Sequence, residues 1–246
     1  MSVKKFETKE YAITEAYQNI SIYSVLADIT LEPTDGEETK VICKEEETIV
    51  HTAFVKDGQL RIRTDDKRKW YQRFGSAREK AEIRVLLPRG NYGSLVVKNT
   101  TGNVEIPSDF EFETVEISVT TGDTLLEASV TGEVRSRVTT GAVSLSGIRC
   151  ERLVSTGTTG SLKMKNVIAR EKMEIARGCG NVDFEDCDGG ELMIKVTTGH
   201  VKGTLLTQKA FCANATTGRV NVPESKGTDI CRVKTTTGKI QIDLAC

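Results

Sequence analysis

Apolar and polar residues alternate in short runs along most of the chain, and between residues 95 and 244 this alternation repeats around a glycine. On either side of the glycine every second residue is apolar, as in Val115, Ile117 and Val119 before Gly122. Alternation with a period of two predicts half-buried β-strands. The central phrase usually reads Thr-Thr-Gly, and it occurs at Gly102, Gly122, Gly141, Gly160, Gly180, Gly199, Gly218 and Gly238.

The spacing of these glycines predicts the architecture. Successive glycines are 20, 19, 19, 20, 19, 19 and 20 residues apart, and a fixed period of this size is typical of a solenoid. A repeat this short cannot hold two strands and a helical crossover. Each repeat therefore predicts a strand, a bend and a second strand, with glycine at the bend because it tolerates positive φ. We predict an all-β fold, a single-stranded parallel β-helix (β-solenoid) with coils of 19–20 residues.

The repeat divides the chain into two parts of one continuous domain. Residues 91–246 carry the regular repeats, whereas residues 1–90 carry a less regular version of the same pattern. The first coil of a solenoid exposes an unpaired strand edge and an open core. We therefore expect residues 1–90 to form an irregular N-terminal cap, with irregular first coils and a hairpin-like insertion that turns at Lys56-Asp57-Gly58.

The opposite end of the predicted solenoid has no comparable cap. The sequence continues for only four residues after Ile242, the last residue of the repeating pattern. We expect the C-terminal coil to form this end, and its open edge to be available for self-association.

Three sequence features together resemble a known family. They are the phrase IxIxxxxADIxLxPTDG at residues 20–36, the Leu-Pro-x-Gly boundary at residues 87–90, and the TTG-x-V-x-I coils that follow. They resemble the bacterial putative adhesin family, a domain of unknown function found in β-strand-repeat proteins of Firmicutes and Bacteroidetes. The resemblance covers nearly the whole chain and implies a β-solenoid with right-handed winding. It carries no catalytic residues over to this chain.

Composition narrows the possible classes of function. The chain has 34 basic and 35 acidic residues and a formal net charge of −1. That balance supplies no overall field that would attract nucleic acid, so we expect no nucleic-acid partner. A hydrophobic content of 38% in 246 residues is enough for a large, continuous core.

The cysteines and the hydropathy pattern bear on location. Seven cysteines without a CxxC pair make a zinc ribbon or a thioredoxin-type site improbable, and Cys187 and Cys231 fall at core positions. No signal-like apolar segment follows the basic start of residues 1–17, and no apolar run is long enough to span a membrane. We predict a cytoplasmic protein, with a cell-surface location by an unrecognised route as the alternative.

One repeat departs from the Thr-Thr-Gly phrase and marks a candidate notch. It reads Arg177-Gly178-Cys179-Gly180 and places Arg177 at a position that is usually apolar and inward. A buried arginine is costly without a partner, so we expect it to reach a carboxylate or solvent, or the coil to bulge. The pair Arg177 and Cys179 could serve as a ligand notch with an arginine donor and a thiol, or the coil could tolerate the change because Gly157 leaves room one coil earlier.

A second candidate site lies in residues 67–80. This segment holds Trp70, Tyr71, Arg73 and Phe74, which interleave aromatic and basic side chains. Such interleaving is typical of nucleic-acid or membrane-surface contacts. The alternative is that the aromatic residues plug the N-terminal end of the core.

Two regular arrays offer weaker signals. The paired threonines before each glycine could bind a flat polymer, an ice surface or a glycan, but we expect their hydroxyls to bond to neighbouring coils and bend amides. Asp183 and Glu185 suggest calcium at first sight. Their columns, however, place Asp183 between Lys163 and Lys202, which favours cross-strand charge pairs. We expect no metal and no cofactor.

Catalytic motifs are missing from the sequence. The only histidines, His51 and His200, are far apart and belong to no triad-like or metal-binding phrase. We therefore predict that the protein is not an enzyme but a β-solenoid binding or scaffold protein that contacts a protein or cell-envelope component. The alternative is a carbohydrate-binding or polysaccharide-cleaving β-helix, which would need carboxylates clustered on one face.

Overall fold

The computed structural model describes residues 6–67 and 81–245. Every regular element in these residues is a β-strand, which confirms the all-β prediction. The candidate partner surface of Trp70, Tyr71, Arg73 and Phe74 lies outside the described residues, as does Cys246. The described residues contain no helix with the length and hydrophobicity needed to cross a bilayer.

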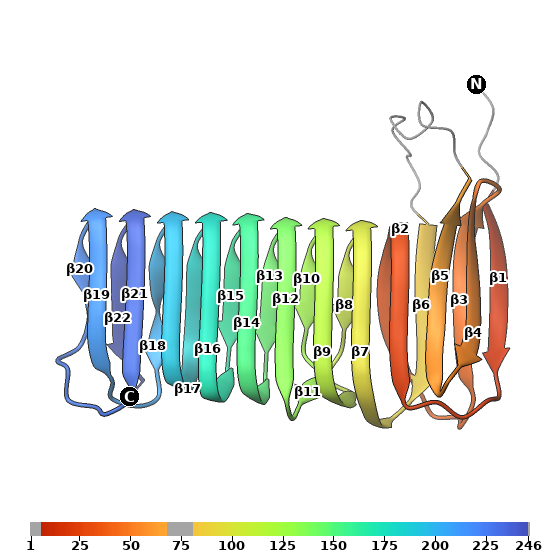
Figure 1. The fold of residues 1–246 in the computed structure, drawn as a ribbon, viewed down its shortest axis with the longest axis horizontal. Helices are drawn as coiled ribbons and strands as arrows, with labels where there is room; N and C mark the ends of the chain where they lie inside the picture. Colours follow the sequence, from red (N-terminus) through yellow and green to blue (C-terminus); the bar gives the residue numbers. More distant parts are fainter. Residues whose placement is uncertain (1–5, 68–80, 246) are drawn as a thin grey trace.

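The regular part of the molecule is a flattened stack of coils with two walls (Figure 1). Long strands form one wall, and short strands form the wall behind it. The long strands are β7 (Gly90–Thr101), β9 (Phe110–Thr121), β12 (Glu133–Thr140), β14 (Arg149–Thr159), β16 (Ile168–Cys179), β17 (Val182–Thr198), β19 (Ala210–Thr217) and β21 (Ile230–Thr237). The short strands are β8 (Val104–Ile106), β10 (Thr124–Leu126), β11 (Ser129–Val130), β13 (Val143–Ser146), β15 (Leu162–Lys165), β18 (Val201–Leu205), β20 (Val220–Asn221) and β22 (Ile240–Leu244). Residues 182–185 of β17 pair with β15 and so also belong to the wall of short strands.

Neighbouring coils are joined by parallel pairing whose register is regular around the bends and shifts near Cys150, Ala169 and Phe184. Thr124 pairs with Val104 on one side, 20 residues earlier, and with Val143 on the other, 19 residues later. Apolar side chains at every second position point inward and stack into one continuous core. The alternation seen in the sequence therefore does define the inner and outer faces of the walls.

The two walls meet at the repeated glycines, and the geometry there excludes other residues. Gly122 has φ of 145°, and a Cβ at this position would lie 2.1 Å from the carbonyl oxygen of Gly102 one coil away. A contact that short cannot be accommodated, so the regular coils need glycine, which has no Cβ and tolerates this φ. The coil of β2 has Ala27 at the equivalent position. The predicted bend at glycine is confirmed.

At the N-terminal end, the order of coils in space differs from their order in the chain. Strand β2 (Asn19–Thr34) is bent and forms a whole coil by itself: it pairs with β7 and β8 on one side. On its other side β2 pairs with β5 (Gln59–Asp66) and β6 (Ala81–Pro88), which come later in the chain. The first coil of the chain is thus covered by the second.

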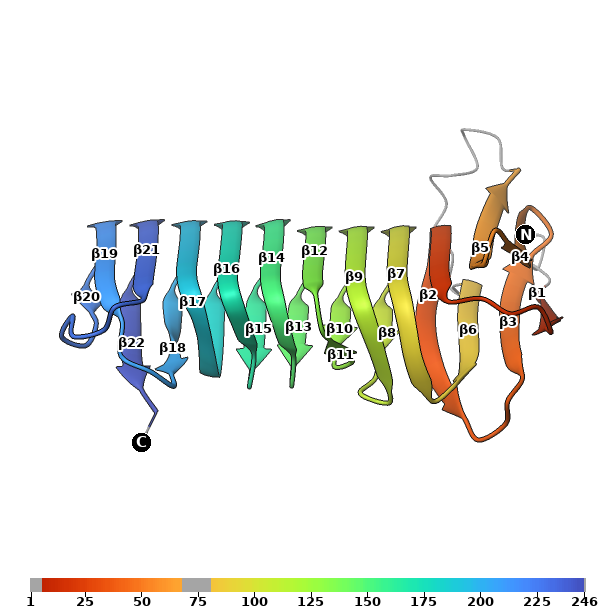
Figure 2. The ribbon, with the colours of Figure 1, turned by 60° about the horizontal axis from the view of Figure 1, so that its bottom comes forward.

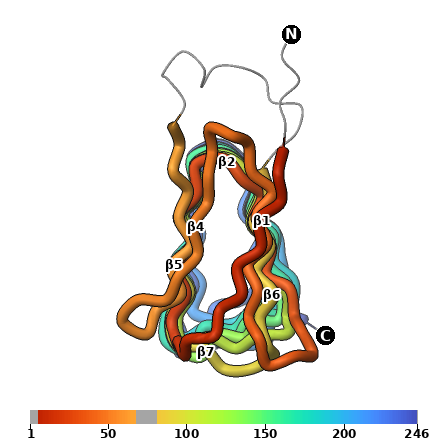
Figure 3. Tube along the Cα trace, turned by 90° about the vertical axis from the view of Figure 1, so that its right-hand side faces the viewer, coloured from red at the N-terminus to blue at the C-terminus, as the bar shows by residue number. Residues whose placement is uncertain are grey.

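Antiparallel strands cover this end further (Figures 2 and 3). Strand β4 (Ile49–Lys56) forms a hairpin with β5, and β3 (Thr39–Glu46) pairs with β6 and with β1 (Phe6–Ile13). The β4–β5 turn has positive φ at both Asp57 and Gly58, as a two-residue hairpin turn requires. The predicted hairpin turn is therefore confirmed.

The C-terminal end shows the same exchange of order. Strand β21 lies between β17 and β19, with Cys231 in register with both Leu192 and Phe211. Strand β22 likewise lies between β18 and β20, with Ile240 paired to Val201 and Val220. The prediction that the C-terminal coil ends the solenoid is wrong, because this coil has neighbours on both sides. In the described part of the chain, β19 and β20 form the open end.

This rearrangement requires two connections to cross, and a buried lysine holds the crossing. A Cβ on Gly227 would lie 2.1 Å from the carbonyl oxygen of Gln208, so the two connections touch backbone to backbone. Next to this contact, Lys209 is 1% exposed. Its Nζ lies 2.6 Å from Asp188 Oδ1 and 3.2 Å from Asp229 Oδ2, and it donates a hydrogen bond to the carbonyl of Gly189.

Candidate functional site

One line of outward residues on the long-strand wall carries a single sign of charge. These residues stand four positions before the bend glycine in each regular coil, and all are in register across the sheet; we call them the basic strip. In spatial order the strip consists of Arg63, Tyr23, Lys98, Ser118, Arg137, Thr156, Ala176, Lys195, Lys234 and Asn214. Five of these ten residues are basic and none is acidic.

Beside the basic strip runs a line of hydroxyl groups, which we call the threonine column. It stands two positions before the bend glycines and consists of Thr100, Thr120, Thr139, Thr158, Thr197, Thr236 and Thr216, with Gly178 as its one interruption. All seven threonines are exposed. None of their hydroxyls forms a hydrogen bond within residues 6–67 and 81–245, so the expectation that they bond to neighbouring coils is wrong.

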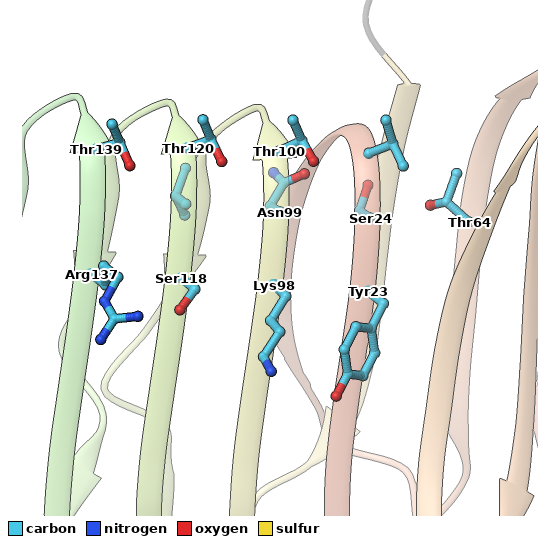
Figure 4. Close-up of a pocket in the computed structure, with 12 residues that line it drawn as sticks. Tyr23, Ser24, Thr64, Lys98, Asn99, Thr100, Ser118, Thr120, Arg137 and Thr139 are labelled. Atoms are coloured by element: carbon cyan, nitrogen blue, oxygen red, sulfur yellow. The ribbon is translucent and has the colours of Figure 1, made fainter. Parts of the chain in front are cut away.

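The basic strip and the threonine column together line a shallow trough. One hollow of about 390 Å³ lies between the row of Tyr23, Lys98 and Arg137 and the row of Thr100, Thr120 and Thr139 (Figure 4). A second hollow of about 390 Å³ continues it from Arg137 toward Lys195. Both hollows are lined by Arg137 and Thr139, so they form one trough, and no carboxylate lines either of them.

The bases in the trough differ from most bases elsewhere on the surface. On other faces, basic and acidic side chains pair across coils, as in Lys165 with Glu185 at 3.3 Å and Arg170 with Glu151 at 2.8 Å. No carboxylate of the described residues lies within ion-pair distance of Lys98, Arg137 or Lys195. Lys98, Arg137 and Lys195 therefore form no ion pair within the described residues, although Glu116 lines an adjoining hollow together with Arg137.

Tyr23 occupies one end of the trough and is held there by cations. The Nζ of Lys98 lies 5.6 Å from the centre of the Tyr23 ring, and the guanidinium carbon of Arg63 lies 5.9 Å from it. Both distances suit cation–π attraction. Tyr23 is 39% exposed and is the one aromatic residue of the basic strip.

Arg177, the first residue of the predicted notch, lies beneath this trough. Its side chain is 4% exposed and points inward, where Nη2 donates to Ser155 Oγ at 2.8 Å and Nη1 donates to the Ala176 carbonyl at 3.0 Å. Burial lowers its pKa to about 10. The prediction that Arg177 reaches a carboxylate or solvent is wrong, because its guanidinium donates hydrogen bonds to a hydroxyl and a backbone carbonyl instead.

Gly157 provides the space for this arginine, as the sequence suggested. A Cβ on Gly157 would lie 3.1 Å from Arg177 Nη1, and the register between the two residues is regular, without a bulge. Arg177 also lines the second hollow, and its guanidinium places a positive charge beneath it.

Cys179, the second residue of the notch, is exposed on the outer face and does not meet the arginine side chain inside the core. Cys187 and Cys231 are fully buried, which confirms their prediction as core residues. Burial raises the pKa of the Cys187 thiol to about 11 and that of Cys231 to about 12. These two thiols are packing residues and are poor nucleophiles.

The acidic residues singled out in the sequence lie beside bases, and one of them forms an ion pair. Asp183 is in register with Lys163 and Lys202, and Glu185 forms its ion pair with Lys165. Across the described ranges, no three His, Cys, Asp or Glu side chains converge in a way that could hold a metal ion.

A buried polar cluster in the N-terminal cap was not anticipated from the sequence. His51 is fully buried. Neither ring nitrogen forms a hydrogen bond of good geometry among the described residues, but Nδ1 lies 3.5 Å from Glu45 Oε2. Its backbone amide donates to Glu45 Oε2 at 2.7 Å, and Glu45 also pairs with Lys9. Burial lowers the pKa of His51. The signal in the sequence was the alternation in β4, which places His51 on the inner face.

Comparison with the profiles of protein families gives a match over nearly the whole chain. The profile of the Toastrack DUF4097 family matches residues 17–245. No curated protein matches the chain closely enough to count as a relative.

Several solved structures resemble the chain at low sequence identity. A putative adhesin from Parabacteroides distasonis superposes with a TM-score of 0.51 at 13% identity, with 98% of each chain covered. A putative adhesin from Bacteroides fragilis gives a TM-score of 0.45 at 14% identity, again with 98% of each chain covered. A putative lipid binding protein from Parabacteroides distasonis gives 0.38 at 14% identity, covering 97% of this chain and 96% of its own.

Proposed function

The chain belongs to the Toastrack DUF4097 family, and on this premise we propose that it is a non-enzymatic binding or scaffold module that presents its long-strand wall to a cell-envelope component. In this proposal the protein is a right-handed β-solenoid of ~19–20-residue coils, rigid enough to hold a row of side chains in fixed register.

The observation that carries this proposal is a trough whose bases form no ion pair. Lys98, Arg137 and Lys195 line it without a carboxylate partner, whereas other faces pair their charges. A partner of opposite charge would gain favourable electrostatic contacts with these exposed, unpaired bases. The extent of the trough over several coils favours a macromolecule over a small molecule.

A carbohydrate-active enzyme is the alternative, and the trough does not favour it. Hydrolysis of a glycosidic bond uses a pair of carboxylic acids that flank the bond. The lining of the trough contains none, and the acidic residues Asp183 and Glu185 stand on the other wall beside lysines. A carbohydrate-binding role without cleavage is compatible with the same surface.

Location is part of the proposal. Four of the six described cysteines are buried and unpaired, which fits a reducing compartment, so we propose a cytoplasmic protein. The alternative is the cell surface, where an envelope polysaccharide would be accessible. Protease treatment of intact cells, with the protein followed by antibody, tests this. Cleavage of the protein in intact cells would contradict the cytoplasmic location and place the protein at the cell surface.

The binding role is tested by co-sedimentation with an isolated envelope fraction. The wild type is compared with Lys98→Gln/Arg137→Gln/Lys195→Gln in the trough. The matched control, Arg149→Gln/Lys163→Gln/Lys202→Gln, removes the same charge from exposed bases outside the trough.

We expect the wild type and the control to sediment with the envelope and the trough variant to stay in solution. Equal behaviour of all three proteins, or failure of the wild type to sediment, would contradict the proposed function.

A further inference from the structure

We propose that the trough binds an acidic polysaccharide whose chain runs along the solenoid axis, across the strands. This inference rests on the proposed function and names the ligand chemistry of the same surface. Its elements are the basic strip, which would meet the anionic groups, and the threonine column, which would meet the sugar hydroxyls.

The arrangement of the bases suits a linear ligand. Neighbouring strands are ~4.8 Å apart, so Lys98 and Arg137, two coils apart, are separated by about 10 Å along the axis. Arg137 and Lys195 are three coils apart, or about 14 Å. Lys195 and Lys234 are adjacent, so the row continues to the C-terminal end of the wall. Charges spaced along one line match the anionic groups of an extended chain.

The threonine column adds a second kind of recognition in the same direction. Thr120, Thr139 and Thr158 offer one exposed hydroxyl per coil, and none is used within the described part of the protein. A hydroxyl both donates and accepts, which suits the hydroxyls of a sugar chain. A ligand with anionic groups for the basic strip and hydroxyls for the threonine column is an acidic polysaccharide, whereas a simple polyphosphate offers no hydroxyls.

The same surface does not suit a nucleic acid. Sequence-independent binding of single strands depends on aromatic side chains on which the bases stack. Tyr23 is the one large aromatic residue of the strip, and Lys98 and Arg63 already pack against its ring. A net charge of −1 also provides no general attraction for a nucleic acid.

A membrane surface fits less well than a polymer. The bases line a hollow, whereas an interfacial protein presents apolar side chains that insert into the headgroup region. Apart from Tyr23, no large hydrophobic residue among the described ones is exposed on the strip.

The test measures affinity for polygalacturonate as the acidic probe, by calorimetry at low and at physiological salt. We expect binding that weakens with salt, and no binding to neutral dextran. The variant Lys98→Gln/Arg137→Gln/Lys195→Gln is expected to bind roughly tenfold more weakly or worse, and Arg149→Gln/Lys163→Gln/Lys202→Gln to bind like the wild type.

A threonine variant separates a polysaccharide from other anions. Thr120→Val/Thr139→Val/Thr158→Val keeps the β-branched shape and removes three hydroxyls. We expect it to lose about tenfold in affinity for polygalacturonate and nothing for inorganic polyphosphate. Circular dichroism and thermal unfolding establish that each variant is folded before binding is measured.

Three outcomes would overturn the inference: no binding of polygalacturonate, tighter binding of single-stranded DNA or phosphatidylglycerol vesicles, or no effect of the threonine variant. Co-sedimentation with the envelope fraction that depends on Lys98, Arg137 and Lys195, without binding of polygalacturonate, would refute the ligand class and leave the proposed function standing. Failure of both experiments would refute both.

Discussion

At both ends of the solenoid, the outermost coil in space is not the outermost coil of the chain. At the N-terminal end β2 is covered by β5 and β6, and at the C-terminal end β21 and β22 are covered by β19 and β20. The N-terminal end then adds the antiparallel strands β1, β3 and β4. The C-terminal end adds no further strand within the described residues.

The difference shows two ways to finish a parallel sheet. An antiparallel hairpin closes the N-terminal end, and the chain near that terminus is folded back into the sheet. At the other end the inward residues of the covering coil contribute little to the core, because Phe211, Ala213 and Ala215 are only partly buried. Ser225 Oγ accepts a hydrogen bond from the Phe211 amide and shields part of the open edge. Stability there depends on the crossing of the two connections.

The largest effect is expected from removing the cation at the crossing. Lys209→Met leaves the carboxylate of Asp188 without its cation, and Asp188 is only 8% exposed. We expect this change to lower the free energy of unfolding by about 3 kcal/mol. The measurement is urea denaturation together with thiol labelling of Cys231, a buried residue of β21.

Two further variants sharpen this result. Lys209→Met/Asp188→Asn removes both charges and is expected to recover part of the loss. Lys9→Met at the N-terminal end acts on a lysine side chain that is 44% exposed, and it is expected to cost less than Lys209→Met. An equal loss at both ends would contradict the special role of the crossing.

A second variant tests the backbone contact of the crossing. In Gly227→Val, the Cβ would lie 2.1 Å from the Gln208 carbonyl oxygen and 2.7 Å from the Lys209 Cα, and backbone cannot move as a side chain does. We expect a loss of about 2–3 kcal/mol, measured as a lowered midpoint of thermal unfolding.

The control is Gly90→Ala at the start of β7, where a Cβ meets no atom within 4 Å. This variant is expected to leave the midpoint nearly unchanged. A Gly227→Val protein as stable as the wild type would show that the two connections do not cross as described.

The smallest effect concerns pH and the N-terminal end. Burial lowers the pKa of His51, whereas an unfolded histidine titrates near ~6.5. Above that pH the side chain is neutral in both states. As the pH falls below it, the unfolded state takes up a proton that the folded state does not, so the free energy of unfolding decreases, by at most about 1.4 kcal/mol per pH unit.

We expect His51→Leu to flatten this pH dependence between pH 6.5 and 5, measured by urea denaturation. Val50→Leu on the same strand is the control and should keep the slope of the wild type. A slope unchanged in His51→Leu would assign the pH dependence to other groups.

Much of the fold follows from the sequence because the repeat is a local rule. Each bend requires glycine with positive φ, and each inward position requires an apolar side chain, so Gly122 or Ile117 can be placed from the phrase alone. The hairpin turn at Asp57-Gly58 is equally local. These predictions are confirmed.

The spatial order of the coils is not a local property. Phe211 and Cys231 occupy the same register position, so either coil could have followed Leu192. Lys209 and Gly227 were the only signals: a lysine at a buried position and a glycine outside the repeat. Their meaning depends on contacts between segments about twenty residues apart, which the repeat pattern does not encode.

The candidate site was predicted in part. The sequence marked Arg177 as an anomaly but not its partner, because the Ser155 hydroxyl lies one coil away on the inner face. It gave the threonine column but assigned its hydroxyls to internal bonds. The basic strip emerges only when the position four residues before each glycine is followed through space. The segment with Trp70 and Phe74 stays a prediction.

The exchanged order at the C-terminal end also has a consequence for biosynthesis. A ribosome releases β19 and β20 before β21 and β22, so the covering coil is available before the coil that it covers. In that interval the register allows β19 to occupy the place beside β17 that β21 takes in the finished protein. We therefore expect maturation of this end to include a step in which β21 displaces β19 from β17. At the N-terminal end β2, β5 and β6 all leave the ribosome before β7, and no such step arises.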